Sequence, residues 1–231
     1  MQKSLRSILT WSAVLILWTF LIFNSNTIFG LRGYYISATI MSLSLVVALI
    51  LSFERSDNNA LKLALISVMS ALCIVGRIAF IAIPMVKPVA ALVIISGIAL
   101  GPQAGFVVGS MTMLISNFMF SQGPWTLWQM FSFGLLGFIS GAIFYNREKI
   151  QNRFVLAVYG LLIYVFVCGP ILDLSGVFGY MAPTKSSLAT TLALGFPVNL
   201  TAGISTFVLL ILISPSLLKK LKRVKIKNGI K

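Results

Sequence analysis

Eight apolar stretches separated by short polar segments constrain the fold of this chain more than any other feature. A helix needs about 20 apolar residues to cross a bilayer. Stretches near this length fall at residues 7–29, 35–53, 61–83, 88–100, 103–120, 125–145, 154–172 and 191–214. The 231-residue chain is 58% hydrophobic, which excludes an ordinary soluble domain. We therefore expect an all-α, multi-pass integral membrane protein of the cell membrane.

Basic residues are distributed unevenly between alternate loops. With the N-terminus inside, only Arg32, Arg77, Lys87 and Lys185 fall on the outer side, and the other fourteen of the 18 lysines and arginines fall inside. This positive-inside bias favours an even number of spans, about eight, with both termini cytoplasmic. The net charge of +14 is then explained by cytoplasmic loops that face anionic lipid, and not by nucleic acid.

The polar segment Ser52–Asn59 separates the first two spans from the remaining six. We predict a transmembrane hairpin (1–53), a cytoplasmic linker (54–60), a six-helix core (61–218) and a basic cytoplasmic tail (219–231). Within the core, the span 88–100 is short, and the dipeptide Gly101-Pro102 ends it. This span either crosses with little tilt or is partly re-entrant.

A polar, aromatic turn, Ser121–Met130, lies between two long apolar runs. It contains Gln122, Trp125, Trp128 and Gln129, whose side chains suit both a membrane interface and contact with a solute. An interfacial tryptophan belt is the simpler interpretation, but it does not explain why glutamines flank the tryptophans. We predict that all four side chains bind substrate.

Charged and amide side chains near the outer ends of spans are further candidates, because such groups are costly inside a bilayer. Arg77 either snorkels to the interface or points into a cavity open to the outside. Lys87 follows in a proline-bounded outer turn. Asn117 and Asn199 bond to neighbouring helices or present donors and acceptors to a ligand. We predict that all four contribute to an outward-facing, positively charged substrate pocket.

The segment Asp173–Thr190 is predicted to be the longest outer loop. Its Gly, Pro, Tyr and Ser residues are typical of a mobile lid. We include Asp173 among the substrate-binding candidates. A helix cap or a salt bridge to Arg77 is the alternative role for this carboxylate.

Small residues form three stripes along the predicted spans of the core. Such stripes usually pack helices inside a bundle, although a stripe that faces outward would dock a partner membrane subunit. We predict partner docking for one stripe on a single face of the third span, formed by Ala60, Ala64, Ser67 and Ala71. The other two stripes are Gly134, Gly137 and Gly141, and Gly97, Gly101, Gly105 and Gly109.

The sequence lacks the residues that several kinds of chemistry require. The chain has no histidine, no CxxC motif and no cluster of carboxylates, so we expect no metal, no cofactor and no enzymatic activity. Cys73 and Cys168 lie inside apolar runs and are expected to be buried, unpaired thiols. No span centre carries a proton-relay carboxylate, and no phosphate-binding G-x-x-x-x-G-K-[ST] loop occurs. The chain thus has a candidate binding site and no energy source of its own.

From about Ala60 to Ser214, the sequence resembles the substrate-binding S components of energy-coupling factor (ECF) vitamin transporters. The turn Gln122–Met130 carries the most specific part of this resemblance. Further parts are Gly76-Arg-Ile-Ala79, Lys87-Pro88, Ile94–Pro102 and Ala104-Gly-Phe106. The resemblance implies a six-helix core in a bacterial plasma membrane that captures a vitamin from outside. It also implies partnership with a transmembrane coupling subunit and two cytoplasmic ATPase subunits.

Among S components, the closest likeness is to the cobalamin type. A corrinoid is bulky and fringed with amides, and it carries one phosphate, which the predicted tryptophans, amides and Arg77 would suit. The same side chains also suit another vitamin or a lipid-like precursor. Alternatives to an S component are a self-sufficient secondary carrier or facilitator, and a non-catalytic membrane assembly protein.

Overall fold

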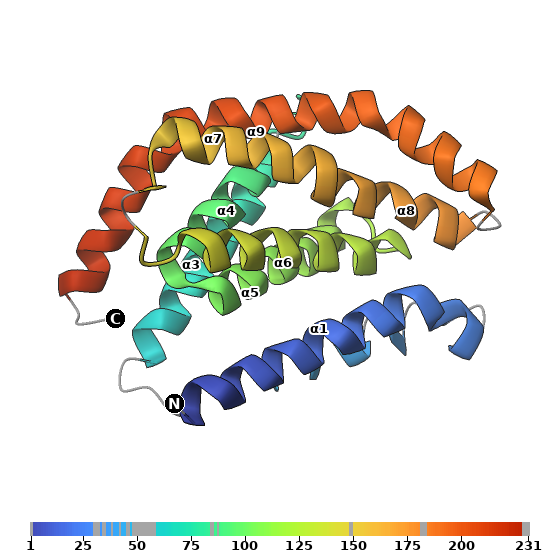
Figure 1. Ribbon diagram of the computed structural model, residues 1–231, viewed down its shortest axis with the longest axis horizontal. Helices are drawn as coiled ribbons and strands as arrows, with labels where there is room; N and C mark the ends of the chain where they lie inside the picture. Colours follow the sequence, from blue (N-terminus) through green and yellow to red (C-terminus); the bar gives the residue numbers. More distant parts are fainter. Residues whose placement is uncertain are drawn as a thin grey trace. The chain divides into compact units, whose positions relative to one another are not determined.

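The computed structural model describes residues 2–29, 59–83, 86, 88–147, 150–180 and 184–227, together with isolated positions between 33 and 47. All regular structure among these residues is helical, as predicted (Figure 1). In this part of the chain, five helical stretches are long and apolar enough to cross a membrane. The chain divides into two compact units, residues 1–61 and 62–231.

The first unit is built on α1 (Gln2–Phe29). One face of α1 buries Trp11, Trp18 and Leu21. The indole nitrogen of Trp18 donates a hydrogen bond to the hydroxyl of Ser44 at 2.9 Å, so this face packs against the segment around residue 44. Much of the predicted second helix of the hairpin lies outside the described residues, and the hairpin stays a prediction.

The second unit is a bundle in which helices close in sequence also pack closely. The helices from the linker onward are α3 (Asn59–Ala79), α4 (Val89–Leu100), α5 (Pro102–Phe120), α6 (Trp125–Phe144), α7 (Arg153–Ile163), the π-helical turn η3 (Tyr164–Cys168), α8 (Gly169–Tyr180) and α9 (Lys185–Lys227). Helix α5 packs on α6, α4 contacts α5, α6 and α9, and α7 and α8 both run along α9 (Figure 1).

Helix α4 is short because it lies inside the bundle. Its 12 residues are all buried except Ala99. At a rise of 1.5 Å per residue it is about 18 Å long, less than the roughly 30 Å of the hydrocarbon core. The predicted break after it is confirmed: Gly101 adopts a φ of 99°, and Pro102 begins α5. A helix this short is tolerated at membrane depth because other helices surround its polar ends.

The glycine stripes pack helices against one another inside the bundle, which is the usual role of such stripes. A Cβ atom on Gly137 would lie 2.2 Å from the backbone oxygen of Gly105, and one on Gly97 would lie 2.2 Å from the oxygen of Gly137. A Cβ on Gly109 would similarly meet the oxygen of Phe133 at 2.1 Å. Only glycine permits this approach of α4, α5 and α6, since any side chain would push the backbones apart.

The predicted lid from Asp173 to Thr190 is wrong. Residues up to Tyr180 belong to α8, and α9 begins at Lys185, so both flanks of the predicted loop are helical. The glycines in this segment favour a loop in water, but an apolar surrounding leaves backbone groups no partners except those within a helix. Helices α7, η3 and α8 consequently form one continuous apolar stretch, Arg153–Phe178.

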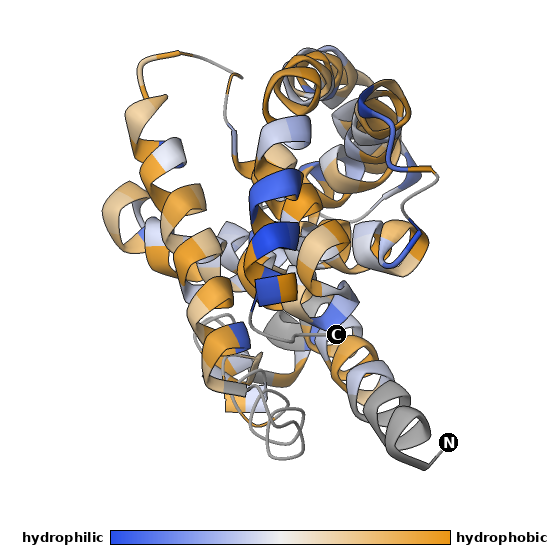
Figure 2. Ribbon diagram, turned by 90° about the vertical axis from the view of Figure 1, so that its left-hand side faces the viewer, coloured by the Kyte–Doolittle hydropathy of each residue, from blue (hydrophilic) through white to orange (hydrophobic). Residues whose placement is uncertain are grey.

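Helix α9 is longer than the span predicted at 191–214. Its 43 residues extend over about 64 Å, roughly twice the hydrocarbon thickness. The basic residues after position 218 therefore continue this helix. Apolar residues cover most of the helices, and the hydrophilic turns of α9 stand out near its C-terminal end (Figure 2).

Candidate functional site

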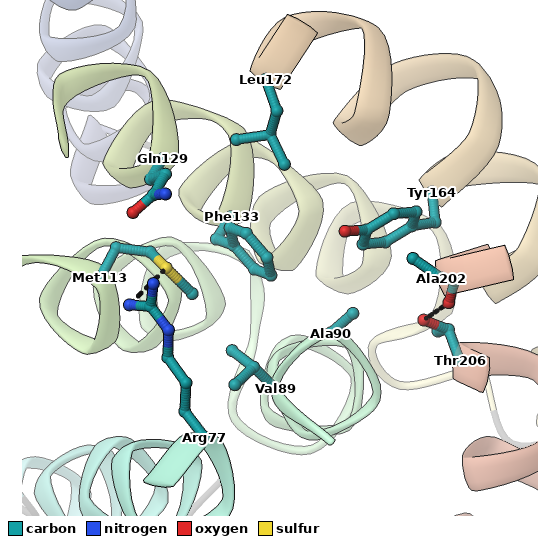
Figure 3. A pocket seen from close by; sticks show the side chains of 10 residues that line it. All are labelled: Arg77, Val89, Ala90, Met113, Gln129, Phe133, Tyr164, Leu172, Ala202 and Thr206. Atoms are coloured by element: carbon teal, nitrogen blue, oxygen red, sulfur yellow. Dashed lines mark hydrogen bonds between the residues drawn. The ribbon is translucent and has the colours of Figure 1, made fainter. Parts of the chain in front are cut away.

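A pocket of about 160 Å³ lies between the helices of the second unit (Figure 3). Every described helical segment of this unit except α7 contributes to its wall. The lining residues are Arg77 of α3, Val89 and Ala90 of α4, Met113 of α5, Gln129 and Phe133 of α6, Tyr164 of η3, Leu172 of α8, and Ala202 and Thr206 of α9.

Among the described residues that line this pocket, Arg77 carries the positive charge. It lies in the last turn of α3, where the helix dipole favours a cation, and it is only 8% exposed. Its guanidinium donates hydrogen bonds to the hydroxyl of Ser116 and to Oδ1 of Asn117, the latter at 2.8 Å. It also lies 4.6 Å from the centre of the Phe120 ring. These contacts are neutral dipoles and an aromatic ring, so the charge of Arg77 is available to a ligand.

Asn117 connects Arg77 to the turn that begins α6. While its oxygen accepts from Arg77, its Nδ2 donates to Oγ1 of Thr126 at 2.9 Å and to Oε1 of Gln129 at 2.8 Å. Asn117 is 1% exposed and does not itself line the pocket. Because its bond occupies Oε1 of Gln129, the amide nitrogen of Gln129 is oriented as a donor for a ligand.

Gln122 stabilises the turn that begins α6 and does not line the pocket. Its Oε1 accepts a hydrogen bond from the Thr126 hydroxyl at 2.9 Å, and its Nε2 donates to the backbone oxygen of Leu114 at 3.0 Å. The chain from Arg77 through Asn117 and Thr126 to Gln122 thus joins α3, α5 and α6 in one polar network. Such a network is favourable in lipid because the buried groups satisfy one another.

Neither predicted tryptophan lines the pocket. Trp128 is 4% exposed and stacks on Phe178 of α8, with ring centres 5.5 Å apart. The ring of Trp125 lies over Gly123, where an added Cβ would be 2.4 Å from it. Both rings therefore fill space around the turn and against α8, next to the network that orients Gln129.

Asp173 and Asn199 pair with each other. Nδ2 of Asn199 donates to Oδ2 of Asp173 at 2.7 Å, which ties α8 to α9. Gly195 leaves room for this carboxylate, since a Cβ there would be 2.2 Å from Oδ2. Neither side chain lines the pocket, although Asp173 adjoins the lining residue Leu172. Lys87, predicted beside Arg77, lies outside the described residues.

Several residues that line the pocket have few sequence features that would identify them as functional. Tyr164 is a polar aromatic residue in the middle of an apolar run, and it lies in a π-helical turn, a feature often found at functional sites. Ala202 and Thr206 are one helical turn apart in α9, where the Thr206 hydroxyl donates to the Ala202 oxygen at 2.9 Å. Phe133 resembles any core residue in sequence, so only the fold identifies it.

The four small residues of the predicted docking stripe are all exposed on α3. They are Ala60, Ala64, Ser67 and Ala71. The Ser67 hydroxyl donates to the Leu63 oxygen of its own helix at 3.0 Å, so it presents no unsatisfied polar group. The neighbouring apolar side chains Leu63, Val68 and Val75 are also exposed. This face of α3 is smooth and apolar, as contact with lipid or another membrane helix requires.

The two cysteines are unpaired and buried, as predicted. Within the described ranges, no three His, Cys, Asp or Glu side chains come together as a metal site would need. Among the described residues, the pocket lining offers one cation, one oriented amide, a phenol and apolar walls. This set is suited to a neutral or weakly acidic organic molecule held by hydrogen bonds and ring contacts.

Comparison with models of known protein families gives a match to this chain. Residues 57–223 match the family model described as ECF-type riboflavin transporter, S component, and this range includes every residue that lines the pocket. No curated protein and no solved structure matches the chain.

Proposed function

The chain belongs to the family of ECF-type riboflavin transporter S components, and from this premise we propose that it captures riboflavin for import driven by partner ATPases. It is an integral membrane protein with several helices that span the membrane. The observation that carries the proposal is that the family match encloses the whole pocket, from Arg77 to Thr206.

The chemistry of the pocket supports a flavin as the substrate. Riboflavin has a flat three-ring system with hydrogen-bonding groups along one edge and a chain of hydroxyls. Phe133 and Tyr164 offer ring faces, while Arg77 and the amide nitrogen of Gln129 offer donors to carbonyl oxygens.

Cobalamin, the vitamin favoured from the sequence, is the alternative substrate. A corrinoid is several times larger than a flavin, so it would require a larger movement of the helices around this pocket of about 160 Å³. The tryptophans that would have covered its faces are occupied with Phe178 and Gly123. The description of the family names riboflavin. We therefore place riboflavin first.

Membership of this family indicates how transport is divided between this chain and its partner subunits. S components of ECF transporters are non-catalytic and partner with a transmembrane coupling subunit and ATPase modules. For this chain, we propose that the exposed stripe on α3, from Ala60 to Ala71, contacts the coupling subunit. Arg77 and Gln129 are the proposed contacts to the vitamin, and Asn117, Thr126 and Gln122 hold them in position.

A fluorescence titration of the purified full-length protein in detergent tests the substrate. Flavin fluorescence is expected to be quenched with a stoichiometry of one, because the ring system would stack on aromatic side chains. Gln129→Leu should weaken binding, whereas Gln151→Leu, an amide outside this pocket, should not. Retention of cobalamin, visible by its absorbance, in place of riboflavin would support the alternative. Binding of neither vitamin would overturn the proposal.

A further inference from the structure

The vitamin pocket has to widen before it can hold a flavin. Its volume is about 160 Å³, below the roughly 300–1,000 Å³ that is usual for pockets enclosing small organic ligands. A vitamin that enters must therefore displace at least one helix of the wall. This need for widening rests on the proposed function, which sets the size of the ligand.

Four helices of the wall are firmly held. Helices α4, α5 and α6 contact one another through backbone atoms at their glycines, among them Gly97 and Gly137, so their separation would break close packing. Helix α3 is attached to α5 by hydrogen bonds from the buried guanidinium of Arg77 to Ser116 and Asn117. Separating α3 would leave this charge without partners, which is costly inside a bilayer. We therefore expect α3, α4, α5 and α6 to keep their places.

The turn that leads into α8 has the features of a hinge. The amide of Gly169 bonds to the carbonyl oxygen of Tyr164, five residues earlier, and Pro170 has no amide hydrogen to continue the helical pattern. Helices kink at prolines and at π-helical turns. On the near side of the turn, the Ser132 hydroxyl of α6 donates to the backbone oxygen of Cys168 at 3.0 Å. Bending is therefore easiest at the start of α8, while α7 stays attached.

Beyond this turn, α8 is held less firmly than the other walls. Its Asp173 accepts a hydrogen bond from Asn199 of α9 at 2.7 Å, and its Phe178 stacks on Trp128 of α6. Asp173 is half-buried, so water can replace the amide of Asn199 when the two helices separate. A Cβ on Gly176, in the middle of α8, would meet none of the described atoms within 4 Å, so the packing around it is open.

We propose that α8 is the movable wall through which the vitamin enters the pocket, and that the pair of Asp173 and Asn199 is the latch that holds this wall closed. Leu172 of α8 and Tyr164 of the hinge both line the pocket (Figure 3). A vitamin inside contacts both and favours the closed position. The positive-inside distribution of charge predicts that α8 is the outer half of its span, on the side from which the vitamin arrives.

A reversible cross-link between α8 and α9 tests the movable wall in the full-length protein in detergent. A Cβ on Gly195 would lie 2.5 Å from Cγ of Asp173, so the double variant Asp173→Cys with Gly195→Cys places two thiols within reach of a disulfide. Stopped-flow quenching of riboflavin fluorescence measures association. Oxidation should slow association more than about tenfold. A reductant should restore a rate at least as fast as that of the wild type, because the variant lacks the latch.

The matched control cross-links α9 to the near side of the hinge. A Cβ on Gly203 would lie 2.7 Å from Cγ2 of Val165, and neither residue lines the pocket. Oxidised Val165→Cys with Gly203→Cys should associate with riboflavin within about twofold of its reduced rate. Peptide mapping verifies each cross-link. Equal slowing by both cross-links would mean general stiffening, and no slowing by the first would mean another route of entry. Either result would overturn the proposal.

Labelling of a thiol in the pocket tests the movement without the vitamin. Ala202→Cys places a thiol in the wall on α9, where a water-soluble maleimide reaches it through an opening. Adding Asp173→Leu, which removes the latch, should accelerate this labelling about fivefold. Unchanged labelling would contradict the movable wall whatever the substrate is. If the wild type binds no riboflavin, the proposed substrate is wrong, and faster labelling still supports α8 as the movable wall.

Discussion

Asn117 is the residue on which the geometry of the vitamin pocket most depends, and replacing it with leucine tests the proposed site. Leucine is similar in size but makes none of the three inter-helical hydrogen bonds of the asparagine, to Arg77, Thr126 and Gln129. The substitution therefore removes the connection between α3, α5 and α6 without creating a large cavity. Ser116 and Phe120 still contact the guanidinium of Arg77.

The expected loss of stability follows from these bonds. In membranes, inter-helical hydrogen bonds average about 0.6 kcal/mol, with a maximum near 1.7 kcal/mol. Two bonds at the mean and the charged one at the maximum add to roughly 3 kcal/mol. Hydrogen bonds contribute more to the stability of soluble proteins. In a membrane, the same polar groups also find hydrogen-bond partners in the unfolded state, so we use the smaller values measured for membrane proteins.

The expected effect on riboflavin binding is smaller. Without Asn117, the Gln129 side chain loses its fixed orientation and must be ordered by the ligand. Ordering one such side chain costs about 1 kcal/mol, which corresponds to a roughly fivefold increase in Kd. Asn117→Asp keeps the acceptor for Arg77 and loses the donors to Gln129, so its Kd should rise by a similar factor with a smaller loss of stability.

Thermal unfolding in detergent and flavin titration measure the two effects. Asn24→Leu is the matched control, because within the described residues the amide of Asn24 bonds to the Phe20 oxygen of its own helix in the first unit. We expect the control to change neither quantity appreciably. Wild-type stability and affinity in Asn117→Leu would refute the network as the support of the pocket. Equal destabilisation by Asn24→Leu would show that the effect is not specific to it.

Three further outcomes are expected. Gly137→Val should lower stability by at least about 3 kcal/mol in thermal unfolding, because its Cβ would meet the Gly105 backbone, which side-chain motion cannot relieve. Ala64→Leu should reduce riboflavin uptake in cells that carry the coupling and ATPase subunits, while the Kd of the purified protein stays unchanged; an unchanged rate of uptake would exclude the α3 stripe as the docking face. Asp173→Leu should destabilise the contact of α8 with α9 by about 1–2 kcal/mol, since the amide of Asn199 loses its acceptor, and wild-type stability would contradict that role.

Much of the architecture is predictable from local features of the sequence. Hydropathy located the first four helices of the core to within about four residues, because each helix satisfies its own backbone in lipid, whereas the last two spans were predicted too short. Gly101-Pro102 marked a helix boundary through backbone restrictions that do not depend on neighbours. The same local reasoning failed at Asp173–Thr190, where glycines and a proline indicated a loop and the apolar surrounding favoured helix.

The candidate site was predictable only in part. Arg77 and Gln129 were identified from the sequence because charged and amide side chains next to apolar spans are costly unless they have a partner or a function. Both of them line the pocket. Trp125, Trp128 and Gln122 were equally conspicuous in the sequence. They lie around the turn that begins α6, however, and do not line the pocket. Sequence composition identifies side chains able to bind a solute, but it carries no information on which way each one points.

The sequence by itself determined that this chain is an all-helical membrane protein, and that it lacks recognisable residues for catalysis or for energising transport. These properties depend on the transfer of individual segments from water to lipid. Only the tertiary structure decided that the glycine stripes pack inward, that Asp173 pairs with Asn199, and that one pocket unites residues from α3 to α9. Those outcomes depend on contacts between side chains far apart in the chain, which close packing selects from many chemically equivalent alternatives.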